Sequence, residues 1–149
     1  MLRLSKLTDY ATVILSDMAK GQTQVHSAME IAAATGIALP TVSKILKLLV
    51  NAEVLISTRG AKGGYVLARE PGKISVATVI SALEGPIALT ECSISQQGCE
   101  QASGCDIRGN WNLINQTIHN ALESVTLADL IRPTVVPEEV LIPVASLYR

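Results

Sequence analysis

Three cysteines, the only ones in the chain, lie within one polar segment: Cys92, Cys99 and Cys105. Six residues separate the first pair and five the second, whereas structural zinc sites favour cysteines about two to four residues apart and redox pairs favour C-x-x-C. Thiolates spread along a longer loop suit a larger object, and iron–sulfur clusters are held by cysteines of such loops. Incidental cysteines tend to be buried as small hydrophobes, yet these lie among Ser, Gln, Glu and Gly. A metal or cluster site and three incidental cysteines are both compatible with this pattern.

The composition indicates what kind of fold surrounds these thiols. The chain has 149 residues, of which 48% are hydrophobic and only 3% aromatic, with no Phe. This length suits one domain, or a small domain with an appendage, and an aliphatic core with few aromatics favours helices. No apolar run approaches the roughly 18 residues that span a bilayer, and the first residues lack the features of a signal peptide. We therefore expect a cytoplasmic protein without a membrane partner, in which an odd number of cysteines argues against a disulfide framework.

The net charge of −1 hides an asymmetry between the two halves of the chain. Residues 1–70 hold eight Lys and Arg against five acids, a net +3, while the remainder holds four bases against eight acids, a net −4. A basic half of this kind can face a polyanion.

Three helices are predicted at the start of the chain. Ser5 caps the first, which ends at Gly21, and Ser27 with Glu30 forms a capping box for the second, which ends at Gly36. Pro40 suits the first turn of the third helix. The inward face of this helix is an apolar stripe of Val42, Ile45, Leu46 and Leu49. Its outward face is polar and basic and comprises Thr41, Ser43, Lys44, Lys47 and Asn51. The second and third helices match a helix-turn-helix pattern, although a generic helical hairpin with solvated lysines fits the same residues.

A predicted β-hairpin follows directly. Its strands are Val54–Thr58 and Tyr65–Ala68, and the glycine-rich turn between them carries Arg59, Gly60 and Lys62. A hairpin with a basic tip after a helix-turn-helix is a wing. Such a tip can enter a minor groove or bind phosphates while the preceding helix reads the major groove. The order of elements therefore favours double-stranded operator DNA as a partner.

Residues 75–85 form another predicted helix, and the cysteine segment, residues 86–106, follows it. Beyond it, apolar residues recur every three or four positions, the spacing of a narrow seam that pairs with another helix. This seam consists of Ile107, Trp111, Ile114, Ile118, Ala121 and Val125. We expect it to form a homodimer, since helix-turn-helix proteins of this type bind paired half-sites; the alternative is a helix that covers only its own domain. A short helix over 126–131 is also predicted.

Several segments together resemble the family of winged-helix iron–sulfur regulators that includes the IscR and NsrR types. They are LRLSKLTDYA at the start, RGAKGGYVL, ISVATVISALEG and the three cysteines before a Trp-containing helix. The match runs from about residue 2 to residue 131, and the opening segment looks most like the subgroup that controls the SUF cluster-assembly operon. The resemblance implies a homodimeric bacterial transcription factor, mainly α with a small β-hairpin. It also implies one iron–sulfur cluster per subunit, 2Fe-2S or 4Fe-4S, and control of cluster-assembly genes.

The resemblance also assigns residues. It makes Cys92, Cys99 and Cys105 the cluster ligands, while Thr41, Ser43 and Lys44 open the recognition helix, Arg59 and Gly60 start the wing, and Arg3 approaches the DNA backbone. We predict four regions: a winged domain (1–85), the cysteine segment (86–106), a dimerisation region (107–131) and a tail (132–149). We expect Lys44 near base edges, Lys47 at a phosphate and Lys62 at the wing tip.

The fourth cluster ligand departs from the IscR pattern. Where that type has a histidine, three residues after the third cysteine, this chain has Arg108, and arginine has no lone pair to donate. The Thr8-Asp9-Tyr10 triplet resembles the NsrR motif whose aspartate comes from the other subunit, so Asp9 is the hypothesised ligand. Asp9 could instead only stabilise a helix N-terminus, and three nearer acids are rivals: Glu91, Glu100 and Asp106.

Three other functions fit parts of the sequence. One is a zinc- or thiol-redox-sensing winged-helix repressor without a cluster. Another is an interaction module that does not bind DNA. A thiol-dependent enzyme is disfavoured, because a nucleophilic cysteine needs a nearby base and His119 lies fourteen residues beyond Cys105. The prediction is therefore a regulator rather than an enzyme.

Overall fold

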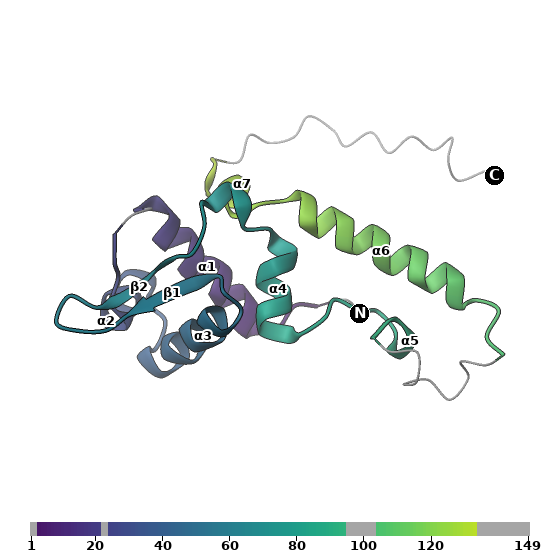
Figure 1. The fold of residues 1–149 in the computed structure, drawn as a ribbon, viewed down its shortest axis with the longest axis horizontal. Coiled ribbons are helices and arrows are strands. Elements are labelled where there is room, and N and C mark those ends of the chain that lie inside the picture. Colours follow the sequence, from purple (N-terminus) through teal and green to yellow (C-terminus); the bar gives the residue numbers. More distant parts are fainter. Residues whose placement is uncertain (1–2, 22–23, 95–103, 134–149) are drawn as a thin grey trace.

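The fold is mainly helical with one two-stranded antiparallel hairpin, as predicted (Figure 1). The computed structural model describes residues 3–21, 24–94 and 104–133. Within them the helices and strands are α1 (Lys6–Lys20), α2 (Ala28–Thr35), α3 (Leu39–Asn51), β1 (Leu55–Thr58), β2 (Gly64–Leu67), the 3-10 helix η1 (Pro71–Lys73), α4 (Val76–Glu84), α5 (Glu91–Ile94), α6 (Arg108–Ser124) and α7 (Leu127–Ile131).

The predicted helix starts and ends are confirmed. The Ser5 hydroxyl accepts a hydrogen bond from the backbone N–H of Thr8 at 3.2 Å, and Ser27 and Glu30 exchange the two bonds of a capping box. These bonds satisfy N–H groups that have no partner within the helix. The backbone N–H of Ser27 is also the main reason that the pKa of Glu30 is lowered. Gly36 ends α2 in the left-handed conformation, with φ 71°.

The core lies where α1, α3 and α4 meet. The stripe predicted for α3 is fully buried, and it packs with Ile14 and Leu15 of α1, which are also fully buried. Both helices also contact α2, which completes the helix-turn-helix. The core is aliphatic, as the composition predicts, and it fixes α3 so that only one of its faces is exposed.

Glu53 turns the chain from α3 into the hairpin. It adopts a left-handed conformation, φ 58°, and is the only described non-glycine residue with positive φ. The N–H of Val54 donates to the carbonyl of Leu49 at 2.9 Å and that of Glu53 to Val50 at 3.0 Å, the two bonds of a Schellman motif. Val54 and Leu49 are both fully buried beneath it, so the direction of the hairpin follows from the end of α3.

The first predicted strand starts one residue later in the structure and ends where predicted, and the second lies one residue earlier. Leu55 pairs with Leu67 and Thr58 with Gly64. A third chain segment joins this sheet, because the backbone of His26 exchanges hydrogen bonds with that of Tyr65, at 2.9 Å and 2.8 Å. The hairpin is thus attached to the α1–α2 connection as well as to α3.

Helix α6 is joined to the winged part near its C-terminal end and to the segment after α4 through its middle. Near its C-terminal end, the N–H of Val76 donates to the carbonyl of Val125 and that of Leu127 to Ile74, each at 2.8 Å. Near the middle of the helix, the Asn115 side chain accepts a hydrogen bond from the N–H of Leu89 at 3.0 Å and donates one to the carbonyl of Ile87 at 3.2 Å. Figure 1 shows α6 extending along the long axis, with the hairpin loop at the opposite end of the molecule.

Two short helices were not predicted: η1 after the hairpin, and α5 inside the cysteine segment. The long helix begins at Arg108 and ends at Ser124, so Ile107 and Val125 flank it rather than belong to it. Among the described helices, none alone has the length and hydropathy to cross a membrane; α2 and α3 reach them only when counted together across a bend of 118°.

Candidate nucleic-acid interface and cysteine site

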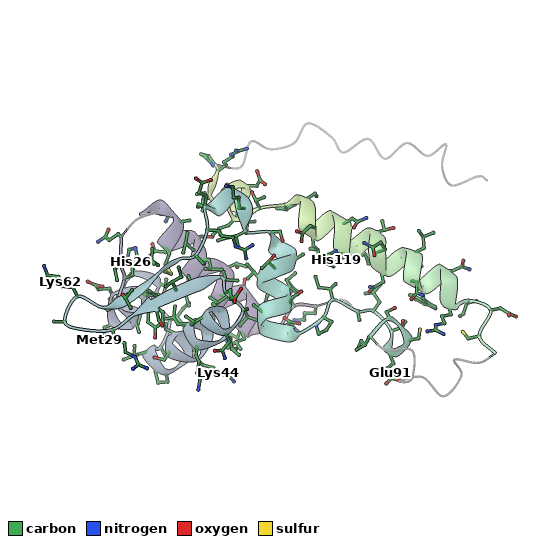
Figure 2. All side chains as sticks on the ribbon, viewed as in Figure 1. His26, Met29, Lys44, Lys62, Glu91 and His119 are labelled. Carbon is green, nitrogen blue, oxygen red and sulfur yellow. The ribbon has the colours of Figure 1, made fainter. Side chains whose placement is uncertain are left out.

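The exposed face of α3 carries the polar residues that the sequence assigns to DNA. Ser43, Lys44 and Lys47 are exposed and Thr41 is half-buried. Their positions follow from the buried stripe on the opposite side, because one face of an amphipathic helix must point outward when the other packs. In Figure 2 the Lys44 side chain extends from α3 away from the body of the protein.

The hairpin loop presents a second basic surface. Arg59, Gly60 and Lys62 are all exposed, and Figure 2 places Lys62 at the tip of the loop. Gly60 has φ 111°, a conformation that L side chains rarely adopt. At the base of the loop, a Cβ on Gly64 would lie 2.5 Å from the carbonyl oxygen of His26. The close contact between hairpin and His26 therefore requires glycine at position 64.

The basic residues assigned to DNA are exposed, as contact with a polyanion requires. Arg3, just before α1, is exposed like the lysines of α3 and the loop. The ion pairs of the described residues are Lys20–Asp17, Lys73–Glu70 and Arg132–Asp129. None of the five bases assigned to DNA takes part in them, so these charges are available for phosphates.

The cysteine segment is described at its two ends. Cys92 is the second residue of α5, half-buried, with its Sγ 3.2 Å from the Thr90 hydroxyl. Cys105 is half-buried and lies three residues before α6, where the N–H of Arg108 donates to its carbonyl at 3.4 Å. Cys99 falls outside the described residues. Cys92 and Cys105 are two partly accessible thiols of the donor type that iron–sulfur clusters use, and they are not joined by a disulfide. The described residues alone contain no group of three metal-ligating side chains.

The candidates for a fourth ligand differ in position. Asp9 is exposed in the first turn of α1, and Glu91 and Asp106 are exposed beside Cys92 and Cys105; Glu100 is outside the described residues. His119 lies in the C-terminal half of α6 (Figure 2), about 16 Å along the helix from Arg108 at 1.5 Å per residue. It lines a cavity between α4 and α6, so it is not placed to join Cys105.

Arg108 itself is half-buried, and its Nε has no hydrogen-bond partner among the described residues. Its guanidinium has no lone pair to donate, so Arg108 does not replace the histidine ligand of the IscR type.

The predicted seam is on the accessible side of α6. The exposed fractions are 56% for Ile107, 37% for Trp111, 44% for Ile114 and 38% for Val125. Ala121 is exposed and Ile118 half-buried. Helix α6 uses a different face, which includes Asn115 and His119, to contact its own chain. The described residues of its own chain therefore leave most of the seam uncovered. In keeping with this, α6 contributes no fully buried side chain.

Sequence reasoning missed the residues that connect these sites. His26 holds the hairpin, Asn115 holds residues 87–89, and Glu84 bonds to the start of α1. The only signal for His26 is the paired glycine at 63–64, which indicates a close backbone approach without naming the partner. Nothing local distinguishes Asn115 or Glu84 from other polar residues on exposed helix faces.

Comparison with known proteins gives the family. The model described as "Rrf2: Iron-dependent Transcriptional regulator" matches residues 4–133. Protein rrf2 of Nitratidesulfovibrio vulgaris is 34% identical over 132 residues, 88% of each chain, and the HTH-type transcriptional regulator IscR of Sodalis glossinidius is 31% identical, over 87% of this chain and 79% of the relative.

Two solved structures are similar in fold and sequence. One is CymR (YrzC), the global cysteine regulator of B. subtilis, with a TM-score of 0.68 and 32% identity over 88% of this chain and 97% of that one. The other is T. potens IscR, with a TM-score of 0.64 and 29% identity over 87% of this chain and 86% of that one.

Proposed function

The chain belongs to the Rrf2 family of winged-helix transcriptional regulators, and from that membership we propose a homodimeric regulator whose affinity for operator DNA depends on an iron–sulfur cluster. Residues 1–85 read DNA, the cysteine segment 86–106 holds the cluster, and residues 107–131 form the dimer. The observation that carries this proposal is the arrangement of Cys92 and Cys105, two partly accessible thiols at the ends of one segment that leads from α4 to α6. The IscR relatives support it.

The DNA-reading part is assigned by exposure and charge. Thr41, Ser43 and Lys44 open the helix that enters the major groove, and Lys47 binds phosphate. Arg59, Gly60 and Lys62 approach the minor groove or the backbone, and Arg3 binds the backbone beside α1. The absence of paired carboxylates around these bases among the described residues supports this assignment, because phosphate contacts with released counterions supply much of the affinity.

The cluster site uses residues of both subunits. Cys92, Cys99 and Cys105 supply three thiolates, and Asp9 of the partner subunit supplies the fourth ligand. When bound, an iron–sulfur cluster, of the two-iron or four-iron type, supplies a redox centre. Because the cysteine segment has few apolar residues to bury, ligand binding contributes to its folding free energy. A ligand from the partner subunit links that ordering to the relative position of the two reading domains.

The test of this proposal is chemical analysis of protein purified without oxygen. We expect iron and acid-labile sulfide in the wild type, with absorption in the visible, and their loss in Cys92→Ala and Cys105→Ala. Ser93→Ala, next to Cys92, is the matched control and retains both. Absence of iron and sulfide from the reconstituted wild type would contradict the proposal. Asp9→Ala tests the fourth ligand against Asp17→Ala; an unchanged spectrum and cluster lifetime exclude Asp9.

The regulated genes follow from the same proposal. We propose that the operators lie before iron–sulfur cluster-assembly genes of the SUF type. Sequencing the DNA that the purified protein retains from fragmented genomic DNA tests this, and retention of unrelated promoters alone contradicts it.

A second function is favoured by the similarity to the cysteine regulator CymR. In this alternative the segment binds no cluster, and oxidation of a thiol such as Cys92, or binding of zinc, changes DNA affinity. Measuring the DNA affinity of metal-free protein distinguishes the two functions. If a mild oxidant changes this affinity and thiol reduction restores it, the thiol mechanism is sufficient. A zinc protein is colourless and carries zinc without sulfide.

A further inference from the structure

The carboxylate of Glu84 connects the last residue of α4 to the first turn of α1. Its Oε1 accepts a hydrogen bond from the backbone N–H of Ser5 at 2.8 Å and a second from the hydroxyl of Thr8. Ser5 and Glu84 are 79 positions apart in the sequence. One oxygen of an acidic residue therefore joins two helices that meet only in the folded protein.

The two groups that donate to Glu84 are held in place by further contacts. Thr8 is fully buried, and its hydroxyl also lies 3.1 Å from the hydroxyl of Ser5, the residue that caps α1. The N–H groups at a helix start need acceptors, and Glu84 supplies one from a different helix. The Thr8 hydroxyl, followed by the Ser5 N–H, lowers the pKa of Glu84. The carboxylate is therefore ionised at neutral pH, where it is the stronger acceptor.

The two ends of the connection lead to different functional regions. Glu84 is followed by residues 85–91 and then by Cys92, and this stretch is held to α6 through the Asn115 bonds to Ile87 and Leu89. On the other side, Thr8 is next to Asp9, and Ser5 lies two residues after the exposed Arg3. A change in the course of the cysteine segment thus reaches the start of α1 through Glu84.

We infer that Glu84 is a positioning residue, which transmits the state of the cysteine segment to the first turn of α1 and so to Arg3 and Asp9. The inference rests on the proposed function for the identity of what the segment binds. The remainder of α1 is fixed by its buried core residues, among them Ile14 and Leu15. Loss of the Glu84 bonds therefore leaves the fold in place and releases only the first turn.

The experiment compares Glu84→Ala, Glu84→Gln and a control in the full-length protein. Each protein is prepared without oxygen, with cluster and after its removal, and its Kd is measured for a duplex selected from a random library with the wild type. The quantity of interest is the ratio of the two Kd values. We expect Glu84→Ala to reduce this ratio at least about fivefold towards one, within the usual range of allosteric coupling. Iron content is measured for each protein, and the Kd values are compared at equal cluster loading.

Glu84→Gln keeps an oxygen that can accept both bonds and should restore most of the ratio. Glu70→Ala is the matched control, because Glu70 is an exposed acid paired only with Lys73 at 3.6 Å. If Glu84→Ala does not fold, Thr8→Val removes the hydroxyl with little change of volume and should lower the ratio in the same direction. A folded Glu84→Ala protein with the wild-type ratio overturns the inference.

A second readout separates this inference from the proposed function. If the wild type binds no cluster, the metal-free protein is treated with N-ethylmaleimide to modify its cysteines, and amide hydrogen exchange is followed by NMR. We expect the amides of Ser5 to Asp9 to change their exchange rates in the wild type but not in Glu84→Ala. Unchanged rates in the modified wild type overturn the inference, whatever the segment binds.

Discussion

The hydroxyl of Ser75 donates a hydrogen bond to the carboxylate of Glu123 at 2.7 Å, which joins the N-cap of α4 to the last turn of α6. The same hydroxyl accepts from the backbone N–H of Thr78 at 3.1 Å. Ser75 is 6% exposed and its neighbours Ile74 and Val76 bond to Leu127 and Val125. The attachment of the long helix to the winged domain is therefore concentrated at one short segment.

We expect Ser75→Ala to lower the free energy of unfolding by about 1–2 kcal/mol, because the substitution removes an N-cap and leaves the bond to Glu123 unmade. Urea unfolding followed by circular dichroism measures this difference. Ser75→Thr keeps a hydroxyl at the cap and is the control. Equal losses in both variants would show that volume at this position, and not the hydrogen bonds, determines the stability.

Glu53→Gly should raise the free energy of unfolding by about 0.5–1 kcal/mol. A non-glycine residue in the left-handed region costs roughly 1–2 kcal/mol, and the greater freedom of glycine in the unfolded chain offsets part of that gain. Ala52→Gly is the matched control: Ala52 has φ −91°, so glycine there should lower the stability. Thermal unfolding of both variants gives the sign of the change in the free energy of unfolding. A loss at position 53 would mean that the Glu53 side chain itself stabilises the end of α3.

Much of the fold could be predicted because its determinants are local. The caps at Ser5, Ser27 and Gly36 and the buried stripe of α3 each depend on residues within a few positions of one another. The contacts that assemble the site are different: His26 to Tyr65, Asn115 to Ile87, and Glu84 to Ser5 connect residues far apart in the chain. Side chains such as Glu84 are typical of any exposed helix face, so no sequence pattern marks them before the helices are packed.

The same distinction applies to the candidate site. Exposure of Lys44 could be predicted from the buried stripe opposite it, and exposure of Arg59 and Lys62 from their place in a hairpin turn. The helix α5 that carries Cys92 could not, since a four-residue helix has too few residues for a periodic pattern.

Arg59→Ala should weaken DNA binding without a change in the visible spectrum. If the Arg59 guanidinium neutralises one phosphate, the slope of log K against log salt concentration falls in magnitude by about 0.9. Fluorescence anisotropy of a labelled duplex across a salt series measures this slope. Lys73→Ala removes an exposed base in η1 that is already paired with Glu70, so its slope should match the wild type. An identical loss in both variants would indicate a general charge effect and would argue against a contact at the wing.

The stability that Glu84 contributes should depend on pH in a defined direction. Its pKa is lowered in the folded protein, mainly by the Thr8 hydroxyl and then by the Ser5 N–H. The contribution is therefore complete above the unfolded pKa, about 4.3, and is lost as the pH falls through the lower folded-state value. We expect the advantage of the wild type over Glu84→Gln in urea unfolding to shrink below about pH 4.3. Glu30 and Asp129 titrate in both proteins and cancel in this difference; an advantage that grows on acidification contradicts the assigned bonds.

Ile114→Glu should dissociate the dimer, whereas Leu113→Glu should not. Both side chains are exposed in the single chain, at 44% and 68%, but only Ile114 lies on the seam. A carboxylate buried without a partner in a helix interface costs about 3–5 kcal/mol, and a charge at position 113 stays in water. Sedimentation equilibrium gives the two association constants.

Trp111, the only tryptophan in the chain, reports on the same surface through its fluorescence. Trp111 is 37% exposed in the single chain, so burial in a dimer should shift its emission to shorter wavelength in the wild type and in Leu113→Glu, and the shift should be absent in Ile114→Glu. Because paired half-sites require two reading domains at a fixed spacing, Ile114→Glu should also lose affinity for a two-half-site duplex. A monomeric wild type would contradict the proposed dimer, and equal dissociation by both variants would place the interface elsewhere on the chain.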